Sequence, residues 1–223
     1  KQAVTALVNE MNVDGQDPKV KFGLARYDGS ASNGGYVVVP ADLNNKTSLL
    51  AAVATLPASG STPLSETLVD VGRYLAGSSL LGSYTQYNKS TSGATVAASS
   101  APQSPVTTKC DKVFAIVVTD GLPTADANDH HGTAFSTTFG AYIDGDGDYT
   151  DDVAAYLFDT DLRPSIEEKQ NAITYTVGFS LDSPLLQHIA DRGDGEHYSS
   201  SDADELAAVL STAVTDILRR NAT

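Results

Sequence analysis

Short continuous apolar runs alternate along this chain with stretches in which apolar residues follow helical spacing. The clearest run covers residues 113–118 and is followed by Thr119, Asp120 and Gly121. A continuous apolar run of this length is typical of a strand buried on both faces of a parallel sheet. We therefore expect this strand to place Asp120 at the carboxyl edge of the sheet, where open α/β sheets bind ligands.

The rest of the chain repeats this alternation. Clusters of β-branched and aromatic residues predict strands, and apolar residues three or four positions apart predict helices. The expected strands are 20–27, 36–40, 113–119, 173–179 and 197–198, and the expected helices are 1–8, 43–56, 64–75, 153–158, 184–191 and 204–220. The order predicts one α/β domain, residues 1–223, with a Rossmann-like, doubly wound, mostly parallel sheet and helices on both faces.

Two further features of the expected fold lie outside this regular alternation. Residues 20–27 and 36–40 are expected to pair as a hairpin at one edge of the sheet. Residues at about 77–109 are rich in Ser, Thr, Ala and Gly, which predicts a flexible surface insertion.

The charge balance narrows the range of partners. The 223 residues include 14 Lys and Arg against 28 Asp and Glu, giving a formal charge of −14. Such a balance opposes nucleic acid or an anionic membrane surface as the main partner and suits divalent cations. The sequence contains no apolar run long enough to span a bilayer, and Cys110 has no second cysteine in the sequence with which to pair.

A hydroxyl-bearing loop precedes the helix expected at 64–75. Ser61 and Thr62 lie in this loop, next to Pro63, a residue suited to the first turn of a helix. Hydroxyl and carboxylate oxygens are hard ligands for divalent cations. Thr62 and Asp120, with Ser61 nearby, are therefore candidate ligands of one cation.

A second candidate cation site is the acidic run at residues 144–152. Its carboxylates alternate with glycines that permit a tight wrap, as in loops that bind Ca²⁺. The sixth and twelfth loop positions hold Tyr149 and Ala155, so the loop is not a regular EF-hand. The expected Ca²⁺ ligands are Asp144, Asp146, Asp148, the carbonyl of Tyr149 or Thr150, and Asp151 or Asp152.

Six segments occur in this order along the chain: residues 21–27, 34–40, 60–68, 110–126, 152–164 and 173–179. They resemble the von Willebrand factor A family and, more closely, the amino-terminal domain of PilY1-type proteins, the tip-associated adhesin and assembly factors of bacterial type IV pili. The resemblance implies a non-enzymatic adhesion or pilus-assembly domain, located outside the cell or on its surface at the pilus tip. It also implies a Mg²⁺ adhesion site that includes Ser61, Thr62 and Asp120. The partner would be a pilus subunit or host-surface protein that supplies an acidic side chain.

The first metal-binding loop of that family, Asp-x-Ser-x-Ser after a hydrophobic strand, has no counterpart in its expected place. The chain begins with helical spacing, so we expect this strand and loop to precede Lys1 in the parent protein. Residues 28–32 satisfy the string as written, but a strand-like segment follows them where the family has a helix. We interpret them as a hairpin connection.

Other functions stay open at this point. The same fold could belong to another surface-binding protein, to a chelatase subunit, or to a metal-assisted hydrolase that uses Asp129, His130 and His131. Adjacent histidines point in different directions on regular backbone, so a surface loop is the favoured interpretation of these residues. The Arg-Gly-Asp tripeptide at 192–194 is interpreted as a chance match in a turn.

Overall fold

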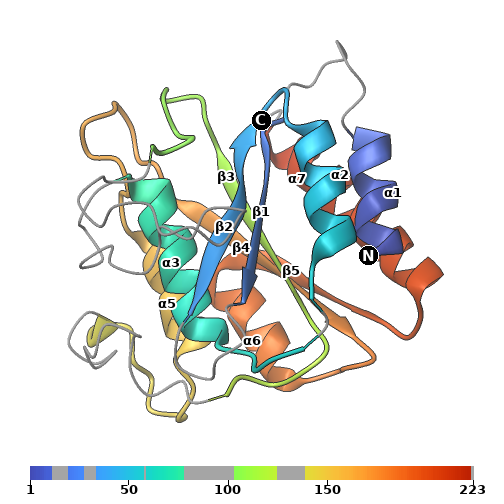
Figure 1. Cartoon of the computed structure of the whole chain (residues 1–223). Helices are drawn as coiled ribbons and strands as arrows, with labels where there is room; N and C mark the ends of the chain where they lie inside the picture. Colours follow the sequence, from blue (N-terminus) through green and yellow to red (C-terminus); the bar gives the residue numbers. More distant parts are fainter. Residues whose placement is uncertain (12–19, 28–33, 58, 78–102, 125–138, 222–223) are drawn as a thin grey trace.

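The computed structural model describes residues 1–11, 20–27, 34–57, 59–77, 103–124 and 139–221. Its strands form two sheets (Figure 1). β1 (Phe22–Tyr27) and β2 (Gly35–Asp42) pair antiparallel, and β3 (Val113–Thr119), β4 (Ala172–Phe179) and β5 (Asp194–Ser200) form a parallel sheet in that order. The fold is a Rossmann-like α/β fold with a small parallel sheet, as the alternation in the sequence predicts.

Helices cover both faces of the parallel sheet. α3 (Leu64–Ala76) and α5 (Thr150–Asp159) lie on one side in Figure 1, and α1 (Gln2–Met11), α2 (Lys46–Thr55) and α7 (Ala203–Asn221) lie on the other. α6 (Pro184–Arg192) packs in the same core as α3 and α5. Among the described residues, no helix is both long and apolar enough to cross a membrane.

The side chains of β3 explain why the run at 113–118 is apolar without interruption. Val113, Ala115 and Val117 pack against the core formed by α3, α5 and α6. Ile116 and Val118 pack against the core formed by α1 and α7. Successive side chains of a strand point to opposite faces, so a strand covered on both faces needs apolar residues at every position.

The hairpin is present, but no backbone hydrogen bonds between the described strands join it to the parallel sheet. The expected place of the hairpin at an edge of the same sheet is therefore corrected to a separate two-stranded sheet. A side-chain contact links the two sheets, because Tyr27 Oη donates to the backbone oxygen of Val118 at 3.4 Å. Tyr27 pairs with Gly35 across the hairpin.

The helix expected at 153–158 begins three residues earlier, at Thr150, and this start lies next to the candidate cation loop. Thr150, Asp151 and Asp152 are polar but fully buried, so the apolar pattern does not mark the true start of α5. Three segments interpreted above fall wholly or largely outside the described residues: 28–32, most of the insertion at about 77–109, and Asp129 with His130 and His131.

Candidate cation site

The loop before α5 is organised by its own aspartates. Each of three carboxylates accepts a hydrogen bond from the backbone N–H two residues later, in turns that short acidic side chains favour. Asp144 Oδ1 accepts from Asp146 at 3.1 Å, Asp146 Oδ1 from Asp148 at 2.9 Å, and Asp148 Oδ1 from Thr150 at 2.8 Å. The intervening glycines have φ of 89° and 96°, a conformation that disfavours other residues. The loop thus coils tightly and gathers its carboxylates beside the first turn of α5.

Two carboxylates of this loop and one from the first turn of α5 converge with a histidine from α6. Ligand atoms of Asp144, Asp146, Asp151 and His188 all lie within 4.8 Å of one another. His188 Nδ1 is 3.5 Å from Asp146 Oδ2 and 3.6 Å from Asp151 Oδ2. These four residues can hold a metal ion, with three carboxylates and one imidazole as donors.

A second residue of α6, Arg192, reaches the same carboxylates. Its Nη1 atom lies 2.9 Å from Asp144 Oδ2, 2.5 Å from Asp151 Oδ2 and 2.8 Å from Asp152 Oδ1. Its Nη2 atom donates to the backbone oxygen of Tyr142. Although burial disfavours the charged guanidinium, its bond to Asp151 and the nearby carboxylates raise the pKa of Arg192 above its usual value.

Asp151 and Asp152 are the buried part of the cluster. Both side chains are 0% exposed, and each uses one oxygen on Arg192. The other oxygens, Asp151 Oδ1 and Asp152 Oδ2, are buried and have no hydrogen-bond partner. Burial, aided by the charge of Asp151, raises the pKa of Asp152 to about 6, and burial also raises the pKa of Asp151. Two buried carboxylates with unsatisfied oxygens are costly, so this cluster is short of positive charge.

The remaining residues of the predicted calcium loop lie beside this group. Asp148 is half-buried, and burial raises its pKa to about 6. Its Oδ1 atom accepts a hydrogen bond from the backbone N–H of Thr150. The Thr150 and Ser65 hydroxyls lie 2.7 Å apart, which ties the start of α5 to α3. Asp152 joins the cluster through Arg192. The pKa of Asp144 shifts in the opposite direction, because the hydrogen bond from the Asp146 N–H lowers it.

The candidate adhesion residues come from two loops that are fastened together. The Thr62 N–H donates to Thr124 Oγ1, and the Thr124 N–H donates to the backbone oxygen of Thr62, both at 3.0 Å. A Cβ atom built on Gly121 would lie 3.4 Å from Thr62 Oγ1. The hydroxyl loop before α3 therefore lies against the turn after β3, which carries the exposed Asp120. Ser61 is partly buried in the same loop.

Sequence reasoning missed His188 and Arg192 as members of the cation cluster. They are four residues apart on α6, a spacing that places two side chains on one helix face. Arg192 also belongs to the Arg-Gly-Asp tripeptide, whose Asp194 lies 3.2 Å from Arg220 Nη1. Both charged residues of that tripeptide are thus engaged within the fold.

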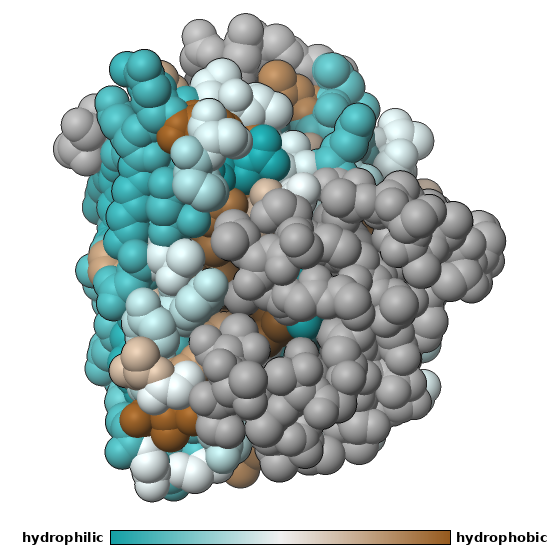
Figure 2. All heavy atoms as spheres, turned by 90° about the vertical axis from the view of Figure 1, so that its left-hand side faces the viewer, coloured by the Kyte–Doolittle hydropathy of each residue, from teal (hydrophilic) through white to brown (hydrophobic). Residues whose placement is uncertain are grey.

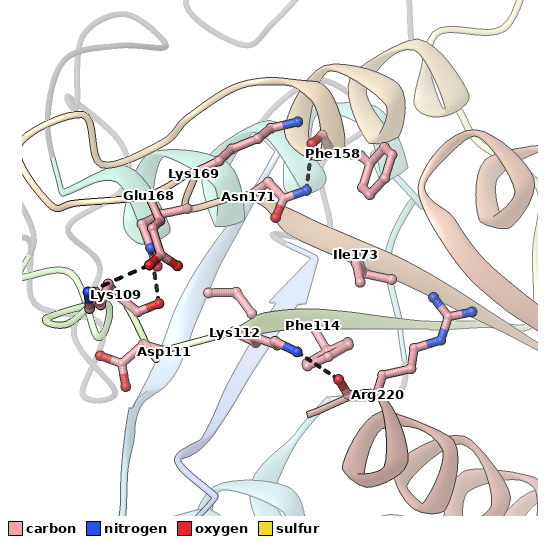
Figure 3. A pocket seen from close by; sticks show the side chains of 12 residues that line it. Lys109, Asp111, Lys112, Phe114, Phe158, Glu168, Lys169, Asn171, Ile173 and Arg220 are labelled. Atoms are coloured by element: carbon pink, nitrogen blue, oxygen red, sulfur yellow. Dashed lines mark hydrogen bonds and ion pairs between the residues drawn. The ribbon is translucent and has the colours of Figure 1, made fainter. Parts of the chain in front are cut away.

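A hollow of about 250 Å³ lies where β3 and β4 begin, and its lining includes several basic residues (Figure 3). Lys109 lies 3.3 Å from Glu167 and 3.6 Å from Glu168. Lys112 Nζ donates to the backbone oxygen of Arg220 at 2.8 Å. These basic groups already have partners within the chain, so the hollow is a weaker candidate site than the aspartate cluster.

Comparisons of the chain with protein-family models, with curated proteins and with solved structures found no match.

Proposed function

We propose that this chain is a non-enzymatic, cation-dependent adhesion or pilus-assembly domain of the von Willebrand A type, acting outside the cell or on its surface at the tip of a type IV pilus. One observation supports this proposal most directly. The hydroxyl loop that carries Thr62 is hydrogen-bonded to the loop after Asp120, at the carboxyl end of β3. This is the region where an α/β sheet binds ligands, and the resemblance to PilY1-type proteins assigns an adhesion site to the same residues.

In the proposed mechanism, Thr62 and Asp120 would hold Mg²⁺, with Ser61 close by. Mg²⁺ requires nearly octahedral oxygen coordination and gives up its waters reluctantly. A carboxylate from a pilus subunit or a host-surface protein would supply a further oxygen ligand. Binding of the partner would then depend on the ion, because neither residues 60–63 nor residues 120–124 include a Lys or Arg that could hold a partner carboxylate.

The aspartate cluster before α5 has a separate role in this proposal. Ca²⁺ prefers several oxygen ligands in a flexible arrangement, and the carboxylates of Asp144, Asp146 and Asp151 supply them. The neighbouring Asp148, Thr150 and Asp152 complete the predicted loop. An ion here would compensate the buried carboxylates and fix the start of α5.

The described surface favours a polar partner interface. Figure 2 shows the face on the α3 and α5 side, where the described residues are mainly hydrophilic and hydrophobic residues form small separate patches. Among the described residues, the large hydrophobic side chains that are exposed are Leu43 and Leu122, at 39% and 52%. Within the part of the chain that the structure describes, two exposed leucines are too few to form a large apolar docking face. Binding through an ion and a partner carboxylate suits such a surface.

The test uses purified type IV pili and the full-length protein carrying Asp120→Ala. We expect the wild-type protein to co-sediment with pili in Mg²⁺ and to be released by a chelator, and we expect the variant to remain in the supernatant. Asp159→Ala is the matched control, because it removes an exposed carboxylate from the far end of α5. If Asp120→Ala binds pili as well as the wild type does, with and without chelator, the proposed mechanism is refuted.

A further inference from the structure

Arg192 lies where a cation would bind to the aspartate cluster. A single atom, Nη1, is within 2.9 Å of oxygens from Asp144, Asp151 and Asp152. The guanidinium thus contacts three carboxylates through one nitrogen. A divalent cation bound to the same oxygens would require much of the space and the favourable electrostatic potential that Nη1 uses.

The charge of Arg192 does not complete the site. Asp144, Asp151 and Asp152 contact one guanidinium, and Asp146 lies beside His188, which adds at most one further positive charge. Asp151 Oδ1 and Asp152 Oδ2 belong to carboxylates that are 0% exposed and face Arg192, yet both oxygens lack a hydrogen-bond partner. These unsatisfied buried oxygens are an observation independent of the acidic composition, and they indicate a ligand with more charge than one guanidinium.

We propose that Arg192 is a displaceable internal counter-ion, which holds the aspartate cluster together without metal and competes with the divalent cation for it. This inference rests on the proposed calcium site and adds its regulation. When Ca²⁺ binds, the guanidinium leaves at least the oxygens of Asp144 and Asp151, because two cations within contact distance repel each other strongly. Arg192 therefore lowers the affinity of the site and sets the Ca²⁺ concentration at which the loop responds.

The decisive comparison is Arg192→Gln against the wild type, with Arg220→Gln as the matched control. Arg220 also forms ion pairs with carboxylates, but with Asp194, Asp216 and Glu196 rather than with the cluster. Chelator-treated full-length protein is titrated with CaCl₂ by isothermal titration calorimetry. We expect Arg192→Gln to lower the Kd for Ca²⁺ at least tenfold and Arg220→Gln to leave it within twofold. Without Ca²⁺, Arg192→Gln should also melt at a lower temperature than the wild type.

The outcomes separate this inference from the proposed site. If the wild type binds Ca²⁺ and Arg192→Gln binds it with equal or lower affinity, displacement is refuted but the calcium site stands. Absence of binding in both proteins refutes the calcium site and the inference together, and Arg192 is then a permanent substitute for a metal. If Arg192→Gln binds Ca²⁺ and the wild type does not, Arg192 competes strongly with Ca²⁺ for the aspartate cluster.

A measurement on the wild type covers the case in which Arg192→Gln does not fold. Nitrogen-15 spectra of the guanidinium groups report whether rotation of each group is restricted, and Arg192→Lys identifies the signal of Arg192. We expect restricted rotation without Ca²⁺ and free rotation after CaCl₂ is added. A signal that stays restricted at saturating Ca²⁺ contradicts displacement.

Discussion

Replacing Asp148 by asparagine is expected to stabilise the cation-free protein at neutral pH and to have little effect at pH 4. Burial, followed by the nearby charge of Asp151, raises the pKa of Asp148 from its usual value near 3.8 to about 6. The folded protein therefore holds this proton more tightly than the unfolded chain does. The stability that Asp148 contributes is fully present below pH 3.8 and is lost as the pH rises through about 6.

The size of the effect follows from that pKa. A rise from 3.8 to about 6 corresponds to at most about 3 kcal/mol of stability between pH 4 and neutral pH. Because the Asp148 side chain is only half-buried, solvent screening reduces this figure, and we expect about 1–2 kcal/mol. Asparagine keeps an oxygen that can accept the hydrogen bond from the Thr150 N–H, so the start of α5 should be preserved.

The assay is urea unfolding in the presence of a chelator, with wild type and Asp148→Asn compared at pH 4 and pH 7.5. The variant should gain stability only at the higher pH. With saturating Ca²⁺ at pH 7.5 the advantage should shrink or reverse, because the wild type then uses Asp148 in the calcium loop. A variant that is less stable at pH 7.5 without Ca²⁺, or that shows the same difference at both pH values, would refute the reasoning.

Two further predictions concern the packing of the fold. Leu157→Ala removes a fully buried side chain of α5 and should lower the free energy of unfolding in urea by about 2–5 kcal/mol. Leu122→Ala, at a side chain that is 52% exposed, should lower it by less than about 0.5 kcal/mol. Similar losses in both variants would contradict the burial of Leu157. Gly178→Ala should destabilise the protein by about 1–3 kcal/mol, because a Cβ at this position would clash with the backbone oxygen of Leu181. A melting temperature equal to that of the wild type would show that the loop after β4 can move aside at little cost.

The sequence predicts the helices and strands correctly where the pattern of apolar residues agrees with the burial of the side chains. The apolar run at 113–118 predicts β3 because a strand covered on both faces requires apolar residues throughout. The predicted start of α5 is wrong by three residues, because there the pattern and the burial disagree. Thr150, Asp151 and Asp152 are buried in the first turn of the helix, but they are polar, so the spacing of apolar residues does not include them.

The sequence predicts only part of the candidate cation site. The alternating aspartates and glycines at 144–148 indicate a cation loop because the pattern is local. His188 and Arg192 lie some 40 residues later, and only the packing of α6 against α5 brings them to the same carboxylates. Nothing in the spacing of α6 distinguishes these two residues from other charged side chains on a helix surface.

The central claim is that the loop at 144–152 binds Ca²⁺ in the folded protein, and thermal unfolding followed by calorimetry tests it most directly. A cation that binds only the folded form stabilises it by mass action, so the melting temperature of the chelator-treated protein should rise with added Ca²⁺. Combined Asp144→Ala and Asp146→Ala substitution should remove most of this rise. Equal calcium-induced shifts in the wild type and the double variant would show that the ion binds elsewhere, and no shift in the wild type would show that the folded protein does not bind Ca²⁺ at this loop.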